Sequence, residues 1–270
     1  MHITVCVKQV PNTTEIKMDP VTNTLDRASA ATIINPYDAH AVEEAVKLTK
    51  KFGGKVSVVS MGPPQAKDVL KKSIEIGADE GYLLTDRAFA GSDTLATSYI
   101  LAKAIEKIAQ KEPIDIIFCG MQAIDGDTAQ VGPGIATRLK YSQLTYVEKI
   151  AEFNEKENTL TVHRKIDNGY EVVKTLLPCL LTVEKSINEI SYSPLPNMIK
   201  AARYSPITWG FDDLDADIKE MGLKGSPTSV RKIFPPKNRE GGEILKGNLD
   251  NVIQLLIKQI KGGVIECLTK

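Results

Sequence analysis

The chain has 270 residues, 42% of them hydrophobic and 25% charged, which is typical of a globular protein with one large domain or a domain plus an extension. Lysine plus arginine and aspartate plus glutamate both total 34, so the formal net charge is zero. The basic excess of a nucleic-acid-binding protein is missing, and we expect no nucleic-acid partner.

The first residues, MHITVCVKQV, form a strand-like run without the basic head and apolar core of a signal peptide. The longest apolar run, Leu176 to Val183, is too short to span a bilayer. We therefore expect a cytoplasmic protein with no membrane insertion.

Strand and helix signals alternate over the first half of the chain. Asn35-Pro36 and Asp93 mark helix starts, because such residues cap the first turn. The predicted strands are Ile3–Val10, Lys55–Met61, Glu80–Thr85 and Ile114–Cys119, and the predicted helices are Pro36 to Gly53, Gln65–Ile76, Asp93 to Lys111 and Val131–Leu139. Repeated β-α units predict an α/β fold with a largely parallel sheet and helices on both faces.

The pattern changes near Thr145, where strand-like runs follow one another without helices. Asp167-Asn168-Gly169 is a strong hairpin signal between two of these runs. The predicted strands are Val147–Phe153, Thr159–Ile166, Tyr170–Leu177 and Cys179–Glu184. We expect appended antiparallel hairpin strands and a last strand that joins the α/β sheet.

The chain is predicted to divide into an α/β domain, residues 1–190, and a C-terminal arm, residues 191–270. Prolines punctuate the arm, which also carries apolar residues such as Trp209, Phe211 and Phe234 that a solvated linker rarely has. Helices are expected at Asp213–Met221 and from Leu249 to Ile260. We expect this arm to bury itself against a partner protein.

The four cysteines are Cys6, Cys119, Cys179 and Cys267. The first three lie in apolar strand-like runs and no C-x-x-C pair occurs, so we expect buried free thiols and no metal site. Any redox chemistry must then come from a bound organic cofactor.

The segment from Gly120 to Gly134 begins where a buried strand ends and finishes by opening a helix. In an open α/β sheet this carboxyl edge is where ligands bind, and the first N–H groups of the new helix can hold phosphate oxygens. A strand-to-helix turn that needs glycines for its geometry is the alternative. The segment has neither a full G-x-G-x-x-G nor a P-loop lysine, which argues against nucleotide hydrolysis by those routes.

The loop GMQAIDGDTAQVGP resembles the G-x-Q-A-I-D-x-D-x-x-Q-x-G signature of electron-transfer flavoprotein β subunits. Ordered matches extend over nearly the whole chain. They are VCVKQVP, INPYDAHAVEEAVKL, SMGPPQA, IGADEGYLL, LPCLLTVEKSINEISY and LPNMIKA. Asn168 departs from the family's hairpin pattern, where an acidic residue or glycine is more common.

The resemblance implies an adenine nucleotide α-hydrolase-like fold and an arm that wraps an FAD-carrying α subunit. It also implies a nucleotide pocket that holds AMP in simple members and a second FAD in electron-bifurcating members. Carried onto this chain, the pocket residues are Cys6, Asn35, Pro36, Tyr37, Asp38, Met61, Gly120, Met121, Gln122, Ala123, Ile124, Asp125, Gly126, Asp127, Thr128, Ala129, Gln130 and Val131.

The run from Gly91 to Thr97 resembles the version found in bifurcating members, in which Asp93, Thr94 and Thr97 reach the flavin and its diphosphate. Asp93 alone could instead be a helix cap. The resemblance therefore favours FAD, with AMP as the alternative. It further implies NADH as electron donor, ferredoxin or flavodoxin as one acceptor, and an acyl-CoA dehydrogenase reached through the α-subunit FAD.

Two segments are candidates for partner contacts by resemblance. Arg164 is a candidate for the α-subunit interface, or simply an exposed hairpin residue. The dehydrogenase-docking loop comprises Leu195, Pro196, Asn197, Met198 and Ile199, whose alternative role is local packing of the arm. A stand-alone ATP-binding enzyme or stress-type nucleotide binder of this fold would explain the β-α units but not the long arm.

Overall fold

The computed structural model describes residues 1–12, 31–229, 242 and 244–268, with the side chains of residues 262–268 excepted. These residues form two compact units, Met1–Lys232 and Ile233–Lys270. Phe234 and the side chain of Cys267 lie outside the described residues.

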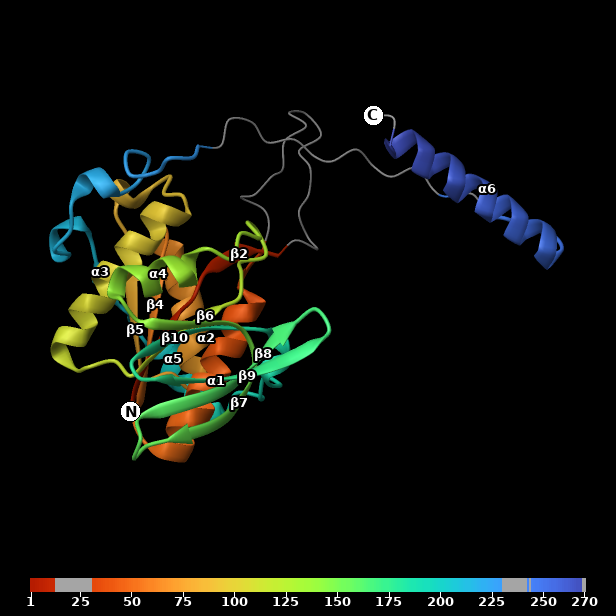
Figure 1. The fold of residues 1–270 in the computed structure, drawn as a ribbon. Helices are drawn as coiled ribbons and strands as arrows, with labels where there is room; N and C mark the ends of the chain where they lie inside the picture. The colour runs from red at the N-terminus through yellow and green to blue at the C-terminus, as the bar shows by residue number, and fades with distance from the viewer. Residues whose placement is uncertain (13–30, 230–241, 243, 269–270) are drawn as a thin grey trace. The chain divides into compact units, whose positions relative to one another are not determined.

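A nine-stranded sheet runs through the first unit (Figure 1). Its strands lie in the order β11 (Ile207–Trp209), β5 (Glu80–Leu84), β4 (Lys55–Met61), β1 (His2–Cys6), β6 (Ile116–Gly120), β10 (Cys179–Val183), β7 (Ser142–Asn154), β8 (Thr159–Ile166) and β9 (Gly169–Leu176). Neighbours pair in parallel from β11 to β7 and antiparallel from β7 to β9. The predicted α/β fold with appended antiparallel strands is therefore confirmed.

Helices cover both faces of the parallel part of the sheet. α1 (Pro36–Phe52) and α2 (Lys67–Ile76) pack on one face, and α3 (Thr94–Lys111) and α4 (Val131–Leu139) lie together on the other (Figure 1). Side chains alternate along each strand, so Phe118 joins the core under α1 and α2 while Ile117 joins the core under α3 and α4. This double burial explains why the central strands are apolar throughout.

Some predicted bounds are confirmed, and others fail for identifiable reasons. Lys55–Met61 and Val131–Leu139 have the predicted ends. The predicted strand Ile3–Val10 is broken after Cys6, because the N–H of Lys8 bonds the carboxylate of Asp38 instead of a neighbouring strand. The rest of that run forms β2 (Gln9–Pro11), which pairs antiparallel with β3 (Thr32–Ile34).

The predicted helix Asp213–Met221 is wrong. Short 3-10 turns form at Phe211–Asp213 and Ile218–Glu220 instead. Asp217 caps the second turn by accepting from the N–H of Lys219, and aspartate favours such local caps over a helix interior. Leu214 and Met221 are both buried against the core under α3, which holds the segment in an irregular path.

Residues 195–209, within the segment predicted as an arm, pack on the α/β sheet and its helices. α5 (Leu195–Arg203) lies against α2, and β11 extends the sheet beside β5. The ring of Trp209 lies 4.6 Å from that of Tyr82, and Lys107 lies over it at 4.6 Å. Trp209 is 6% exposed, so this contact closes one edge of the core.

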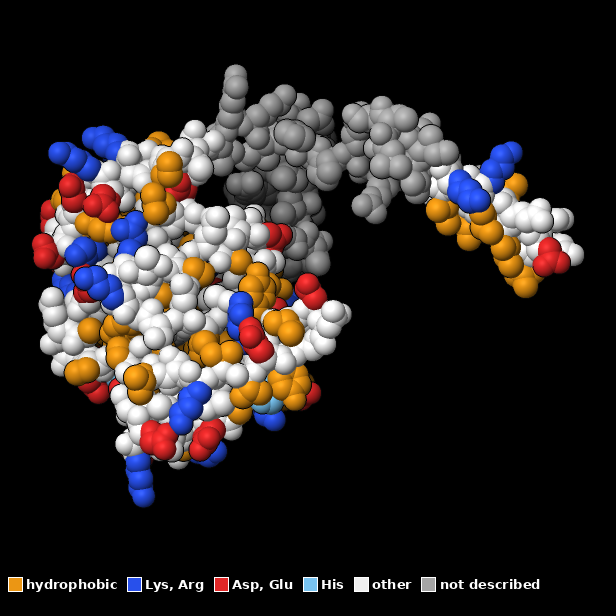
Figure 2. Space-filling model, in the orientation of Figure 1, with side chains coloured by type: hydrophobic (Ala, Val, Ile, Leu, Met, Phe, Trp, Pro, Cys, Tyr) orange, Lys and Arg blue, Asp and Glu red, His pale blue; other side chains and the backbone are white. Residues whose placement is uncertain are grey.

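The second unit contains α6 (Leu249–Leu268), which extends beyond the predicted end at Ile260. Apolar side chains, among them Ile253, Leu256 and Ile260, remain exposed along this helix (Figure 2). Among the described residues, no helix is long and apolar enough to cross a membrane.

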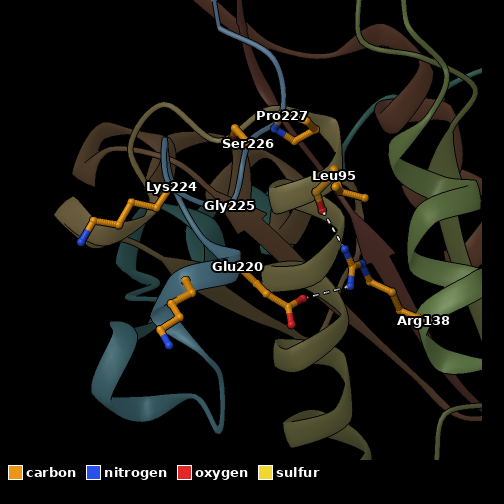
Figure 3. A pocket seen from close by; sticks show the side chains of 8 residues that line it. Leu95, Arg138, Glu220, Lys224, Gly225, Ser226 and Pro227 are labelled. Atoms are coloured by element: carbon orange, nitrogen blue, oxygen red, sulfur yellow. Dashed lines mark hydrogen bonds and ion pairs between the residues drawn. The ribbon is translucent and has the colours of Figure 1, made fainter.

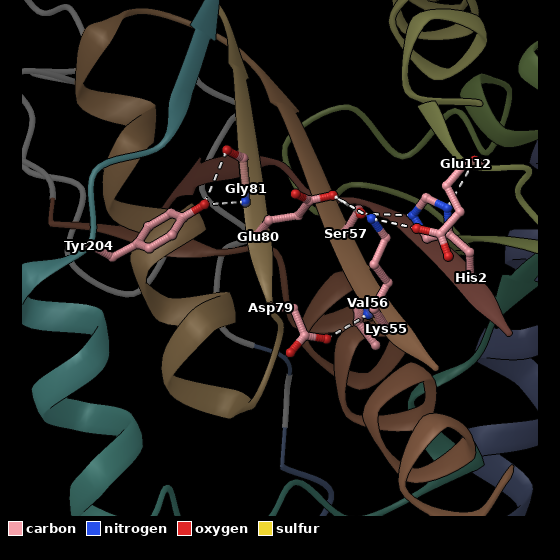
Figure 4. A network of polar contacts seen from close by, with 9 residues as sticks. All are labelled: His2, Lys55, Val56, Ser57, Asp79, Glu80, Gly81, Glu112 and Tyr204. Carbon is pink, nitrogen blue, oxygen red and sulfur yellow. Dashed lines mark hydrogen bonds and ion pairs between the residues drawn. The ribbon is translucent and has the colours of Figure 1, made fainter. Parts of the chain in front are cut away.

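A polar network ties the amino ends of the central strands together (Figure 4). Nε2 of His2 lies 2.8 Å from the hydroxyl of Ser57, which donates to the Glu80 carboxylate at 2.7 Å. Lys55 forms ion pairs with Glu80 at 3.3 Å and with Glu112 at 2.8 Å. Burial lowers the pKa of His2, so at neutral pH this network contains an uncharged imidazole. The network stabilises the sheet edge opposite the candidate site.

Cys6, Cys119 and Cys179 are buried free thiols, as predicted. Within the described residues, no cluster of three or more histidine, cysteine, aspartate or glutamate side chains could hold a metal ion.

Replacing Trp209 tests whether β11 is an integral part of this unit. We expect Trp209→Ala to lower the free energy of unfolding by about 3–5 kcal/mol, because it removes a large buried ring. Urea unfolding followed by circular dichroism measures the change. Tyr192→Ala is the control, since Tyr192 is fully exposed and should change stability by less than about 0.5 kcal/mol. A Trp209 variant as stable as the control would show that β11 contributes little.

Candidate functional site

The strand order reverses between β1 and β6. The chain builds β4 and β5 on one side of β1, then crosses to place β6 and β10 on the other. Cys6 and Cys119 are register partners near the carboxyl ends of β1 and β6. A crevice at such a point, outside the carboxyl ends of the strands, is where open α/β sheets bind ligands.

Two buried side chains at the start of α1 brace the loops beside this point. The amide of Asn35 donates to the carbonyl of Gln122 at 2.9 Å and accepts from the N–H of Ile124 at 3.2 Å. Asp38 accepts from the N–H of Lys8 at 2.8 Å and from that of Gly120 at 3.1 Å. Asn35 was predicted to cap α1, but its side chain makes no cap hydrogen bond because the loop uses it instead.

Gly120 permits the close approach of Asp38 to the end of β6. A Cβ at this position would lie 2.2 Å from a carboxylate oxygen of Asp38. Burial raises the pKa of Asp38 to about 7, although the hydrogen bonds from Asn35, Lys8 and Gly120 favour its charged form. Asp38 is therefore a bracing carboxyl whose charge depends on pH near neutrality.

The loop between β6 and α4 has an unusual backbone. Asp127 and Ala129 adopt left-handed conformations, with φ of 50° and 53°. The amide of Gln122 donates to the Asp127 carboxylate at 2.8 Å, and the N–H groups of Gly126 and Asp127 bond the carbonyl of Ala123. Left-handed residues in a loop orient successive N–H groups to the same side, which forms a concave anion-binding arrangement.

A row of backbone donors follows this turn. Within the described part of the chain, the N–H groups of Thr128 through Gly132 have no hydrogen-bond acceptor. They lead into the first turn of α4, where the helix dipole favours negative charge. Gly126 faces open space, since a Cβ there would meet no atom within 4 Å. The arrangement is suited to bind a phosphate group.

Side chains fix both ends of the loop. Lys8 donates to both carboxylate oxygens of Asp125, at 2.7 and 2.8 Å. At the other end, the hydroxyl of Thr94 donates to the side chain of Gln130 at 2.8 Å. The loop is thereby held between the end of β1 and the start of α3.

Asp93 caps α3 and anchors a distant segment. One carboxylate oxygen accepts from the N–H groups of Leu95 and Ala96, and the other accepts from the N–H and hydroxyl of Thr228. The N–H of Asp93 also donates to Ser226 at 2.8 Å. Asp93 is thus engaged as a helix cap, the alternative noted for it from the sequence.

The structure brings most of the sequence-predicted pocket residues to one edge. They are Cys6 at the end of β1, Met61 at the end of β4, Asn35, Pro36, Tyr37 and Asp38 at the start of α1, and the loop from Gly120 to Val131. Thr94 joins them through Gln130, and Thr97 lies half-buried one turn further along α3. Contact with Cys6, together with burial, raises the pKa of Cys119, so this thiol stays protonated and unreactive.

A cavity of about 350 Å³ opens nearby, between the start of α3 and residues 219–227 (Figure 3). Arg138 lines this cavity, and its guanidinium donates to the carbonyl of Leu95 and pairs with Glu220 at 3.5 Å. It also lies over the ring of Tyr99. We assign this cavity to the packing of the C-terminal segment on α3.

The predicted partner residues lie elsewhere on the surface. Arg164 bridges strands, donating to the carbonyl of Thr145 at 3.0 Å and pairing with Glu171. Leu195, Pro196, Asn197, Met198 and Ile199 form the first turns of α5. The predicted docking segment is therefore helical, and its Leu195 is 68% exposed.

Sequence reasoning missed the residues that hold the site together over long range. Lys8 could have been found, because it directly follows a strand that ends at the carboxyl edge. Thr228 and Ser226 gave no signal, since their contact with Asp93 depends on the path of the C-terminal segment.

Comparisons with known proteins point to one family. The family model described as "Electron transfer flavoprotein domain" matches residues 22–211. The chain is 50% identical to Protein FixA of Azotobacter vinelandii over 88% of this chain and 85% of that protein. It is 47% identical to the electron transfer flavoprotein subunit beta of Thermoanaerobacterium thermosaccharolyticum, over 96% of this chain and 98% of that protein. It is 44% identical to the corresponding protein of Clostridium acetobutylicum, over 97% of this chain and 98% of that protein.

The raised pKa of Asp38 predicts a pH-dependent stability. From its ordinary pKa of 3.8 up to about 7, the folded protein holds a proton on Asp38 that the unfolded chain has lost. The free energy of unfolding should therefore fall as pH rises through this window, by about 4 kcal/mol for this group. Asp38→Asn cannot ionise and should remove that part of the pH dependence.

Urea unfolding between pH 4.5 and 8 measures the effect. The exposed Asp167→Asn is the matched control and should keep the wild-type pH profile. Parallel profiles for Asp38→Asn and the wild type would contradict the assignment.

Proposed function

Because the chain belongs to the electron transfer flavoprotein family, together with proteins named FixA or subunit beta, we propose that it binds FAD. The proposed site for the adenine nucleotide part of FAD is the carboxyl edge of the sheet. Membership of the family gives the chain a role in electron transfer, an association with flavin or nucleotide, and an α-subunit partner. The N–H groups from Thr128 to Gly132 have no acceptor among the residues that the structure describes, and this row of donors is the observation that carries the proposal.

The residues at this edge fit such a group. The free N–H groups and the start of α4 would hold the phosphates, which need donors and no bulky side chain. Open space at Gly126 leaves room for them. Cys6, Tyr37 and Met61, at strand ends and the start of α1, would line the nucleoside part.

In this proposal the bound flavin supplies the electron-transfer chemistry, while the chain positions it and excludes competing reactions. The protonated thiol of Cys119 offers no competing redox group. We propose NADH as the electron donor and a ferredoxin or flavodoxin as the acceptor of one electron. The second electron would pass by way of the FAD of the α subunit to an acyl-CoA dehydrogenase, which would make the complex electron-bifurcating. We propose that it works in the cytoplasm.

One observation favours the alternative, a single-FAD carrier whose β subunit binds AMP. Asp93, which the bifurcating reading assigns to the flavin, has both carboxylate oxygens engaged by α3 and by Thr228. A flavin contact at Asp93 therefore requires the Thr228 contact to break. AMP requires no such change, because its phosphate needs only the loop.

Partner contacts are proposed at three exposed surfaces. Exposed apolar side chains of α5 form the first and are proposed to dock the dehydrogenase. The strand pair at Arg164 and the exposed apolar side chains of α6 are proposed to contact the α subunit. The exposure of the apolar side chains on α5 and α6 suits contacts completed by another chain.

Filling the open space at Gly126 tests the nucleotide site. Gly126 lies outside the left-handed region and a Cβ there meets nothing, so Gly126→Leu should fold normally. It should lower the nucleotide content of the complex by about tenfold or more, since even ~1.4 kcal/mol of lost affinity is tenfold. Nucleotide released from the purified complex with its α subunit is identified and counted by chromatography.

The count also separates the two cofactor assignments. Two FAD molecules per complex support bifurcation, and one FAD plus one AMP supports the simple carrier. Gly242→Leu, at an exposed glycine with similar open space in the second unit, is the control and should keep the wild-type content. A Gly126 variant with unchanged nucleotide content would overturn the site.

Leu195→Ala tests the docking surface. The variant should weaken electron delivery to the dehydrogenase while flavin content stays unchanged, because Leu195 is exposed and far in sequence from the loop. Dehydrogenase reduction rates measured at several dehydrogenase concentrations should show a higher half-saturation point. Ile218→Ala, 45% exposed in the 3-10 turn Ile218–Glu220, is the control, because no partner contact is proposed there. Lost flavin in the Leu195 variant would point to a packing role instead.

A further inference from the structure

Lys8 lies where the two loops of the candidate site meet. Its ammonium group contacts both oxygens of Asp125, at 2.7 and 2.8 Å, although both side chains are partly exposed. Within the described part of the chain, this is the ion pair that involves the loop from Gly120 to Val131.

The backbone of Lys8 is fixed by the same two residues that brace the loop. Its N–H donates to Asp38 and its carbonyl accepts from the N–H of Asn35 at 2.9 Å. Asn35 and Asp38 also bond the backbone of the loop at Gly120, Gln122 and Ile124. The backbone of Lys8 and the amides of the loop are therefore held on one frame, while the exposed lysine side chain can change its partner.

The charges of the loop require a cation when a phosphate binds. Asp125 and Asp127 both carry carboxylates, and Asp127 accepts a hydrogen bond from the uncharged side-chain amide of Gln122. A phosphate bound beside these two carboxylates would add negative charge close to them and would be repelled by them. The free N–H groups supply partial charges, whereas Lys8 supplies a full positive charge within reach of the loop.

We propose that Lys8 binds a phosphate of the nucleotide and that Asp125 holds the lysine in its place until the nucleotide arrives. Binding then exchanges the contact between Lys8 and Asp125 for one between Lys8 and the phosphate. A carboxylate and a phosphate both offer charged oxygens to an ammonium group, which makes Asp125 an internal competitor of the ligand. This inference rests on the proposed function, because it assumes that the loop binds a nucleotide.

The rival interpretation is an exposed salt bridge that only pins the loop. Such a pair stabilises a protein by about 0–1 kcal/mol and would affect nucleoside and nucleotide binding alike. The exchange model predicts instead an effect confined to ligands that carry a phosphate.

The experiment measures the binding of AMP and of adenosine to the full-length chain by calorimetry, after removal of co-purified nucleotide. Lys8→Met should weaken AMP binding about tenfold or more, the value of a charge-assisted contact, and leave adenosine binding unchanged. Lys8→Arg keeps the charge and should retain most of the AMP affinity. Lys174→Met is the matched control, because Lys174 forms a comparable exposed pair with Glu157 at 2.6 Å in the hairpin region.

Asp125→Asn tests the exchange itself. It should tighten AMP binding several-fold when Lys8 is present and have a much smaller effect in the Lys8→Met background. If Asp125→Asn tightened AMP binding equally with Lys8 present and in the Lys8→Met background, Asp125 would act only by repelling the phosphate. That result would overturn the exchange. Thermal unfolding confirms that each variant is folded.

The outcomes separate this inference from the proposed function. If the wild type binds neither AMP nor adenosine, the nucleotide site fails and the role of Lys8 falls with it. If the wild type binds AMP and Lys8→Met binds it equally well, or loses AMP and adenosine to the same degree, only the role of Lys8 is overturned.

Discussion

The buried carboxyl group of Asp38 is the constraint on which the candidate site depends. It bonds the backbone after β1 and the backbone at the end of β6, the two strands between which the sheet order reverses. Asn35 completes the brace by holding the loop at Gln122 and Ile124. Because both residues are buried at the start of α1, the helix, the strands and the loop form one frame. The free N–H groups further along the loop can then be preorganised without a ligand.

Local patterns determined most of the fold, and long-range contacts determined the site. The strand Lys55–Met61 and the helix Val131–Leu139 follow from apolar periodicity and flanking breakers, which are properties of neighbouring residues. The end of β1 does not, because a hydrogen bond between Lys8 and a residue 30 positions away stops the strand. The arm predicted for residues 191–270 was inferred from its prolines and apolar residues, whereas the contact between Trp209 and Tyr82 could not be inferred from local sequence. The region of the ligand site was predictable from the buried strand that ends at Gly120, and Asn35 and Asp38 were named by resemblance. Their hydrogen bonds across the loops were not predictable from local sequence.

The electrostatics of the loop explain how a segment with two aspartates can face a phosphate. Asp127 is bonded by Gln122 and shapes the left-handed turn, while Asp125 is neutralised by Lys8. When a phosphate binds, the proposed exchange would transfer the positive charge of Lys8 from Asp125 to the ligand. The cost is a backbone with Ala129 in a left-handed conformation, a strain of order 1–2 kcal/mol that the surrounding contacts must offset.

The start of α3 links cofactor choice to the C-terminal segment. Asp93 caps the helix with one oxygen and binds Thr228 with the other, and Thr228 lies beside the last described residue of its unit, Ser229. A ligand that recruits Asp93 must compete with Thr228, whereas a ligand confined to the loop leaves that contact intact. An FAD large enough to reach α3 would thus be bound at the expense of the anchored position of the segment from Ser226 to Thr228. AMP would leave it anchored, so the position of this segment should report which nucleotide the protein carries.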